Sequence, residues 1–237
     1  MIIAGPCAIE GRNFIDIAQE VKRLGATHIR GGVFKPRSSP SRWSGIGLEA
    51  LPLLNEARDA TGCDVVVEAM SARQIGLLYA YVDIFQVGTR NATNTELLKE
   101  LGKQEKPVLY KRGMAQTIEE FVMGADFILS EGNPNVVLCE RGIRTFETYT
   151  RNTFDVSCIP AVKELCELPI IADPSHGTGR RSLITPVARA AIAAGANGVI
   201  VEVHNDPDKA MTDSEQSIDY SAFEELVKEI KRVKEAL

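Results

Sequence analysis

The sequence lacks the segments that would carry a chain into or across a membrane. No run of residues approaches the roughly 18 consecutive apolar positions that a membrane-spanning helix needs. Residues 1–6 are apolar, but they are too few for the hydrophobic region of a secretory signal, and no basic segment precedes them. We therefore expect a cytoplasmic protein with no membrane partner.

Closely spaced cysteine pairs are also missing. The five cysteines are odd in number, and no two of them have the CxxC spacing typical of redox and metal motifs. They are Cys7, Cys63, Cys139, Cys158 and Cys166. Without a secretory signal, this pattern indicates a reducing compartment, and we expect structural roles for Cys63, Cys158 and Cys166.

An excess of positive charge is absent as well. The chain has 27 lysines and arginines against 32 aspartates and glutamates, which gives a net charge of −5. This balance argues against nucleic acid or an anionic membrane as a general partner. It still allows a local basic pocket for a phosphate.

What is present is an alternation of short apolar runs with amphipathic segments over 237 residues. The runs predict strands at residues 2–4, 27–30, 64–68, 84–87, 107–110, 136–139, 170–172 and 198–202. The amphipathic segments predict helices at residues 14–24, 48–60, 71–80, 93–101, 117–129, 159–165, 184–194 and 221–233. Continuous apolar strands alternating with helices indicate a parallel sheet that is buried on both faces. Eight such units without a linker favour a single-domain (β/α)8 TIM barrel over an open doubly wound sheet.

Polar clusters follow seven of the eight predicted strands. They are Gly5-Pro6-Cys7, Arg30-Gly31-Gly32 with Lys35-Pro36-Arg37-Ser38-Ser39, Gly88-Thr89-Arg90-Asn91, Lys111-Arg112-Gly113, Glu140-Arg141-Gly142, Asp173-Pro174-Ser175-His176-Gly177 and Glu202-Val203-His204-Asn205-Asp206. In a barrel the loops that follow the strands converge on one mouth, where catalytic groups lie. The clusters therefore predict one site.

Four of these residues are candidate metal ligands: Cys7, His176, Glu202 and Asp213. They follow the first, seventh and eighth strands, which are neighbours around a closed barrel. A thiolate, an imidazole and two carboxylates suit one divalent transition ion (Mn²⁺, Fe²⁺, Zn²⁺ or Co²⁺) better than Mg²⁺ or Ca²⁺. Taken singly, Cys7 also fits a buried apolar position and His176 a hydrogen-bonded loop, while Asp213 lies in a polar loop where aspartate is common.

Cations form a second set at the strand ends, consisting of Arg30, Lys35, Arg37, Arg90, Lys111 and Arg141. Converging cations repel one another unless anions neutralise them, and six could balance two phosphoryl groups and a carboxylate. The alternative is ion pairing with Glu68, Glu140 and Asp173 at the same face. The Gly-Thr-Gly at residues 177–179 is weak evidence for a phosphate loop. We expect His28 to pack in a strand beneath the site. His204 is expected to contact the site, to flank it or to lie on the surface.

The motifs at residues 5–7, 35–39, 88–91, 139–142 and 173–176 resemble those of 3-deoxy-D-arabino-heptulosonate 7-phosphate (DAHP) synthase. The resemblance is to the compact class that is related to 3-deoxy-D-manno-octulosonate 8-phosphate synthase, and it runs from residue 2 to about residue 220. It implies a (β/α)8 barrel that condenses phosphoenolpyruvate with erythrose 4-phosphate and water in the shikimate pathway.

The resemblance also implies roles for individual residues. The metal ligands would be Cys7, His176, Glu202 and Asp213, and Cys7 and His176 would also be catalytic. Phosphoenolpyruvate would bind to Arg90, Lys111 and Arg141, with Arg30 and Lys35 nearby, and the aldose phosphate would bind to Arg37 and Ser38. Lys35 is the candidate proton donor or acceptor.

Two departures from the family pattern concern the loops. The usual Lys-Pro-Arg-Thr-Ser reads Lys-Pro-Arg-Ser-Ser at residues 35–39, which keeps the hydroxyl at Ser38. The usual Asp-Gly reads Asp213-Ser214, which could alter the backbone beside the last ligand. We expect no regulatory or chorismate mutase domain, a homodimer or homotetramer, and feedback control only through a separate partner such as a chorismate mutase.

Two alternatives remain open at this point. The related octulosonate synthase uses arabinose 5-phosphate, but it carries Lys-Ala-Asn-Arg-Ser-Ser where this chain has the shorter motif of residues 35–39. A catalytically silent barrel that binds an anion or a metal is an alternative of another class. The presence of both predicted residue sets argues against it.

Overall fold

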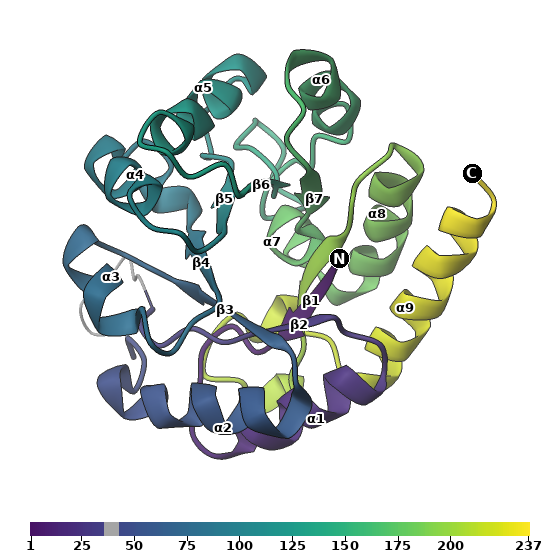
Figure 1. Ribbon diagram of the computed structural model, residues 1–237. Coiled ribbons are helices and arrows are strands. Elements are labelled where there is room, and N and C mark those ends of the chain that lie inside the picture. The colour runs from purple at the N-terminus through teal and green to yellow at the C-terminus, as the bar shows by residue number, and fades with distance from the viewer. Residues whose placement is uncertain (36–42) are drawn as a thin grey trace.

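Eight short parallel strands follow one another around a closed barrel in the computed structural model, which describes residues 1–35 and 43–237 (Figure 1). The strands are β1 (Ile2–Gly5), β2 (His28–Arg30), β3 (Asp64–Glu68), β4 (Ile84–Val87), β5 (Val108–Lys111), β6 (Val136–Glu140), β7 (Ile170–Ala172) and β8 (Val199–Glu202). The barrel closes because β1 pairs with β8, in a register that sets Gly5 beside Glu202. The closed barrel is therefore confirmed.

Alternate residues of each strand point to opposite sides of the barrel wall, as the period of two requires. Side chains of seven strands fill the interior, namely Ile3, Val66, Ile84, Leu109, Cys139, Ile171 and Ile200. The neighbouring positions, such as Ala4 and Val65, belong to a second and larger cluster between strands and helices. The continuous apolar runs of the sequence thus reflect strands that are buried on both faces.

Helices surround the barrel and cover its outer face (Figure 1). They are α1 (Asn13–Arg23), α2 (Leu51–Thr61), α3 (Ala72–Leu78), α4 (Thr95–Gly102), α5 (Ile118–Leu129), α6 (Cys158–Leu165), α7 (Pro174–Thr178), α8 (Arg181–Ala193) and α9 (Tyr220–Glu235). Capping fixes several starts: Thr117 and Glu120 form a reciprocal capping box at α5, and Asp219 caps α9. Among the described residues, no helix is long and apolar enough to cross a membrane.

All eight predicted strands are present with ends that differ by at most one residue, and all eight predicted helices are present within three residues. One short helix was expected to be a loop. The five-residue α7 begins at Pro174, which suits the first helical position, and Asp173 caps it. Gly179 ends it in the left-handed conformation, with φ of 68°. The Gly-Thr-Gly segment therefore stops a helix.

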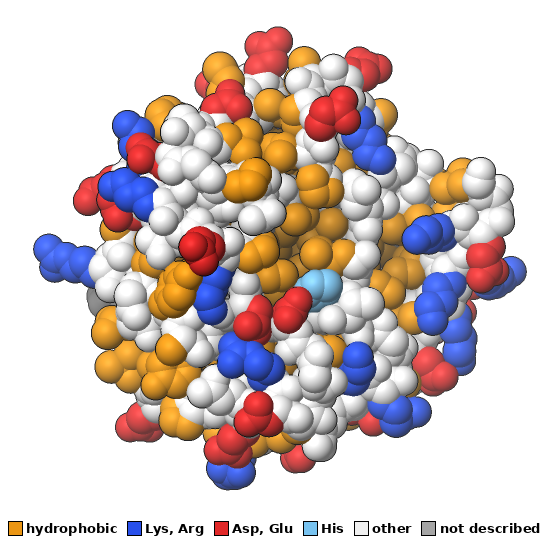
Figure 2. All heavy atoms as spheres, in the orientation of Figure 1, with side chains coloured by type: hydrophobic (Ala, Val, Ile, Leu, Met, Phe, Trp, Pro, Cys, Tyr) orange, Lys and Arg blue, Asp and Glu red, His pale blue; other side chains and the backbone are white. Residues whose placement is uncertain are grey.

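The two ends of the barrel differ in character. Figure 2 shows the end where the strands begin, with apolar side chains around a shallow depression and a histidine among charged groups. His28 lies in β2 and lines this depression, 3.9 Å from Asp64. The opposite end, where the strands finish, carries the described residues of the polar clusters predicted from the sequence. The expected position of His28, in a strand beneath the site, is confirmed.

Candidate active site

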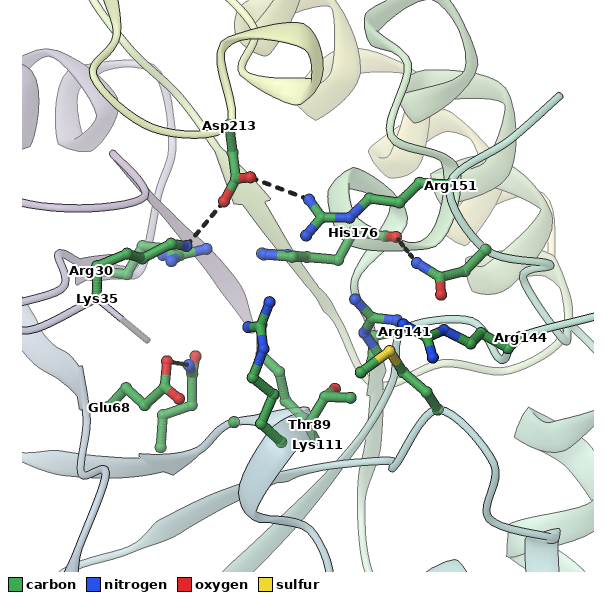
Figure 3. Close-up of a pocket in the computed structure, with 15 residues that line it drawn as sticks. Arg30, Lys35, Glu68, Thr89, Lys111, Arg141, Arg144, Arg151, His176 and Asp213 are labelled. Atoms are coloured by element: carbon green, nitrogen blue, oxygen red, sulfur yellow. Dashed lines mark hydrogen bonds and ion pairs between the residues drawn. The ribbon is translucent and has the colours of Figure 1, made fainter. Parts of the chain in front are cut away.

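A cavity of about 320 Å³ opens at the end of the barrel where the strands finish (Figure 3). The residues that line it are Arg30, Lys35, Glu68, Gln86, Gly88, Thr89, Arg90, Lys111, Met114, Arg141, Arg144, Arg151, Asn152, His176 and Asp213. They come from the ends of β2, β3, β4 and β5 or from the segments that follow β2, β4, β5, β6, β7 and β8. One mouth therefore collects side chains that are far apart in the sequence.

The lining is strongly cationic. Among the described residues that line the cavity, seven are lysine or arginine and only two are glutamate or aspartate. Three of these cations are almost fully buried, with exposed fractions of 6% for Arg30 and 4% each for Lys111 and Arg141. Burial lowers the pKa of Arg141, which means that its charge is incompletely compensated by neighbouring carboxylates. An anion with more than one charge would relieve this repulsion.

Possible metal ligands gather beside the cavity. One donor atom each from Cys7, Glu202 and Asp213 lie within 4.8 Å of one another. The pairing of β1 with β8 brings Cys7 and Glu202 together, and the Cys7 thiol donates a hydrogen bond of 2.9 Å to Asp213 Oδ2. The Lys35 ammonium contacts Cys7 Sγ and lies 2.8 Å from the same oxygen of Asp213. The fold thus assembles three of the four predicted ligands from both ends of the chain.

His176 completes the predicted set, because its Nε2 lies 3.4 Å from Glu202 Oε1. Its other ring nitrogen, Nδ1, lies 2.8 Å from Asp173 Oδ2, and its backbone N–H donates to Asp173 Oδ1 at 3.0 Å. Burial lowers the pKa of His176 even though Asp173 and Glu202 oppose that shift. A neutral imidazole whose Nδ1–H donates to a carboxylate presents an Nε2 lone pair, which is the form that binds metals.

The ionisation of the ligand side chains and one buried oxygen among them suit a divalent cation. Burial raises the pKa of the Cys7 thiol, with Glu202 adding to the effect, so that a thiolate here needs a nearby positive charge. Burial alone would raise the pKa of Asp213, but Lys35 and His176 hold it below its usual range. Glu202 Oε1 is buried and accepts no hydrogen bond from any described residue. This orphaned oxygen among sulfur, imidazole and carboxylate donors fits a divalent transition ion.

Five of the six predicted cations line this cavity, and some of them also form ion pairs. Lys111 Nζ lies 2.5 Å from Asp173, and Arg30 Nη1 lies 3.3 Å from Glu202. The other two carboxylates proposed as partners bind elsewhere, because Glu68 accepts from Gln86 and Glu140 pairs with Arg112. Arg90 lines the cavity in the turn after β4. The predicted Arg37 and Ser38 lie outside the described residues.

Several functional candidates were not predicted. Arg144 and Arg151 line the cavity from the long connection between β6 and α6. Both follow β6, as Arg141 does, and this position identified Arg141 from the sequence. They lie too far beyond the end of the strand for the same signal to identify them. Arg112 is buried and pairs with Glu140 and Asp155. His204 is buried 3.4 Å from Glu10 and does not line the cavity, so that it flanks the site.

The fold and the cavity together define a class of protein. It is a (β/α)8 barrel whose mouth can bind a multiply charged anion next to a set of metal-binding side chains. The family model described as the DAHP synthetase I family matches residues 1–237. The chain therefore belongs to the DAHP synthetase I family, and the expected function as a DAHP synthase is confirmed.

Individual relatives agree with the family. Phospho-2-dehydro-3-deoxyheptonate aldolase of Thermotoga maritima is 49% identical over 237 residues, which cover 100% of this chain and 70% of the relative. Its crystal structure superposes with a TM-score of 0.96, covering 100% of this chain and 69% of that one. By contrast, 2-dehydro-3-deoxyphosphooctonate aldolase of Bradyrhizobium diazoefficiens is 31% identical, with 97% of this chain and 87% of the relative covered.

Proposed function

We propose that the chain condenses phosphoenolpyruvate with erythrose 4-phosphate and water, releasing phosphate, as the first step of the shikimate pathway. The cavity that carries seven lysines and arginines against two carboxylates supports this proposal most directly. Two phosphoryl groups and a carboxylate would balance that excess, and the ligand set lies at the edge of the same cavity. Family membership supports the same reaction.

The enol phosphate is assigned to the inner cations. Arg90, Lys111 and Arg141 would hold its phosphate and carboxylate, with Arg30 and Lys35 nearby, all from rigid strand ends or the turns after them. Preorganised charges of this kind stabilise developing negative charge without reorganising during the reaction. The erythrose 4-phosphate would be anchored through its phosphate by Arg37 and Ser38, which lie outside the described residues.

The bond changes follow from the chemistry of an enol phosphate. C3 of phosphoenolpyruvate attacks the aldehyde carbon, and the aldehyde oxygen takes up a proton. C2 then captures water, which loses a proton, and the resulting hemiketal phosphate collapses by C–O cleavage to give a ketone and phosphate. Lys35 is the candidate to hold or move a proton near the reacting carbons, because its ammonium lies between the ligand set and the cavity.

One divalent transition ion (Mn²⁺, Fe²⁺, Zn²⁺ or Co²⁺) is the proposed cofactor, held by Cys7, His176, Glu202 and Asp213. It would supply a Lewis acid that polarises the aldehyde carbonyl. Exhaustive chelation should abolish turnover, and one of these ions should restore it. Cys7→Ala and His176→Ala should remain folded and fail to bind the ion. Full activity in protein proven to be free of metal would refute the cofactor assignment.

The aldose provides the sharpest test of the reaction. We expect kcat/KM with erythrose 4-phosphate to exceed that with arabinose 5-phosphate, and Arg37→Ala should raise KM for the aldose phosphate more than for phosphoenolpyruvate. Because one carbon is worth only about 1–3 kcal/mol of discrimination, some cross-reaction is expected. Preference for the five-carbon sugar would make the chain an octulosonate synthase, the second candidate, which the 31% identical relative supports. Metal binding without any reaction would indicate a silent barrel.

Isotope labelling tests the order of bond changes. In ¹⁸O-water the label should appear in the product ketone, and its appearance in the released phosphate alone would exclude the scheme.

We further propose that the barrel carries the complete active site and assembles as a homodimer or homotetramer. Feedback inhibition by aromatic amino acids is then expected only with a partner such as a chorismate mutase, because it needs a second site with differential affinity for two states.

A further inference from the structure

Gln216 is a buried polar side chain that neither the ligand set nor the cavity lining includes. It lies in the short 3-10 turn η4 (Ser214–Gln216), and only 2% of it is exposed. Its backbone N–H donates to the carbonyl of Asp213 at 3.1 Å. Asp213 itself is left-handed, with φ of 52°. That residue therefore turns the chain so that Gln216 points back toward the end of β8.

Both ends of the Gln216 amide are engaged. Nε2 donates to Glu202 Oε2 at 2.6 Å, and Oε1 accepts from Arg151 Nη1 at 2.6 Å. The neighbours fix this orientation of the amide. Turning it over would set its carbonyl against a carboxylate and its NH₂ group against a guanidinium, leaving four buried or half-buried polar groups mismatched.

The hydrogen bond from Gln216 makes the two oxygens of Glu202 unequal. Oε2 is occupied by the amide, whereas Oε1 accepts no hydrogen bond from any described residue and lies 3.3 Å from Arg30 Nη1 and 3.4 Å from His176 Nε2. Oε1 is thus the oxygen presented to the other ligands. A carboxylate with one oxygen tied in this way favours binding an ion through the other oxygen alone.

The same amide also reaches the cavity wall through Arg151. The Nη1 atom of Arg151 donates both to Gln216 and, at 3.1 Å, to Asp213 Oδ1, while Asp213 Oδ2 faces Cys7 and Lys35. Figure 3 shows Asp213 between Lys35 and Arg151. Each of the two carboxylates therefore has one oxygen held by this network and one oxygen directed toward the ligand set.

We propose that Gln216 is a positioning residue that selects the ligating oxygen of Glu202 and holds Arg151 against the cavity. This inference rests on the proposed metal site. One buried amide would then connect the metal ligand Glu202 with Arg151 of the substrate cavity.

Metal affinity measured on the purified, metal-free protein tests the proposal without relying on turnover. Gln216→Met keeps the volume and loses both hydrogen bonds, whereas Gln216→Glu keeps the acceptor for Arg151 and faces Glu202 with a like charge. Competition against a chromophoric chelator should show the Kd for Co²⁺ raised about 10–100-fold in both variants, as for other groups that orient metal ligands. Gln104→Met, at a half-buried position after α4 away from the site, serves as the matched control.

Two further readouts separate positioning from packing. The visible absorption of bound Co²⁺ should change in Gln216→Glu, because that near-isosteric variant alters the geometry of Glu202. Because Arg151 lines the cavity that takes both phosphorylated substrates, their KM values should rise more in Gln216→Met than in Gln216→Glu, which keeps the partner of Arg151. A Kd within twofold of the parent value and an unchanged Co²⁺ spectrum in Gln216→Glu would overturn the inference. Failure of the parent protein to bind Co²⁺ would instead overturn the proposed metal site.

Discussion

Lys111 lies at the floor of the cavity, between a carboxylate of the protein and the space proposed for the substrate. Its ammonium pairs with Asp173 at 2.5 Å, and both side chains are buried, while the same ammonium faces the space assigned to phosphoenolpyruvate. Asp173 also holds His176 through Nδ1 and the backbone N–H. The loss of one lysine should therefore affect stability, substrate binding and the orientation of a metal ligand together.

Lys111→Met should lower the free energy of unfolding by about 3–5 kcal/mol, the usual cost of leaving one charge of a buried pair alone. It should also raise KM for phosphoenolpyruvate. Urea unfolding and steady-state kinetics measure the two effects. In Lys111→Met/Asp173→Asn the buried charge is gone, so that stability should recover while KM stays high. If KM recovered together with stability, Lys111 would be a purely structural residue.

Asp155 predicts a pH dependence with a defined sign. Burial opposes its ionisation, but hydrogen bonds from Ser157 and Arg112 outweigh burial and lower its pKa. A carboxyl whose folded pKa is lowered stabilises the protein fully above its unfolded value of about 3.9, and that contribution is lost as pH falls through the folded pKa.

Asp155→Asn should therefore cost about 1.5–3 kcal/mol at pH 7, the range for hydrogen bonds to a charged group. The difference from the parent should shrink as pH falls below about 4. Unfolding free energies of both proteins across pH 3–7 provide the measurement, and Ser157→Ala should show a weaker form of the same trend. A gap that stays constant with pH would mean that Asp155 acts through packing.

At the level of single residues, the sequence predicted those that immediately follow strands. Cys7, Arg30, Lys111, Arg141, His176 and Glu202 all lie within four residues of a strand end, or within the strand itself, where fold class alone fixes their position. Arg151 lies eleven residues beyond β6, and the loop path that brings it to Asp213 has no periodic signal. The position of Gln216 depends on the left-handed turn at Asp213, and no pattern in the sequence predicts that turn.

Among the elements, the segment between β8 and α9 decides how the last ligand is placed. The family pattern raised the concern that Ser214 replaces a glycine. Within the described residues, the one non-glycine residue with positive φ is Asp213 itself, and Ser214 begins the 3-10 turn η4. Aspartate tolerates the left-handed conformation because its side chain is short and polar. The serine thus meets no demand that only glycine could satisfy.

Ser214→Gly should leave metal affinity unchanged and should lower the free energy of unfolding by about 0.5–1 kcal/mol, because glycine loses more backbone freedom on folding. Asp213→Asn should keep the turn, since asparagine also adopts this conformation, and should weaken metal binding. Calorimetry with Co²⁺ and thermal unfolding would measure both variants. A tenfold gain in affinity for Ser214→Gly would show that the serine strains the loop.

Strands and long helices were predictable because burial imposes periods of two and 3.6 on the sequence. The short α7 was not, because five residues are too few to show a helical period, although Asp173-Pro174 is a start signal and Gly179 a stop signal. Its effect on the site is large, since the cap of α7 is also the partner of His176. Capping signals therefore deserve weight even where no periodic segment follows.

At the scale of the whole molecule, the barrel closes where the first strand meets the last. Gly5 pairs beside Glu202, and Cys7 follows β1, so that the ligand set bridges β1 and β8. An ion bound there would link the segment after β1 to β8 and the loop that follows it. By mass action it would add about 2.7 kcal/mol at a hundredfold excess over its Kd, but only against openings that separate these ligands.

A bound ion would therefore stabilise β1 and β8 against local opening more than the other strands. If β1 and β8 part before the rest of the barrel, added Co²⁺ should slow amide hydrogen exchange in those two strands more than in β4 and β5, which carry none of the ligands. Equal slowing in all four strands would mean that the seam opens only in global unfolding. Without the ion the same fold would keep a weaker junction between β1 and β8, and proteolysis would be expected to begin in these two strands.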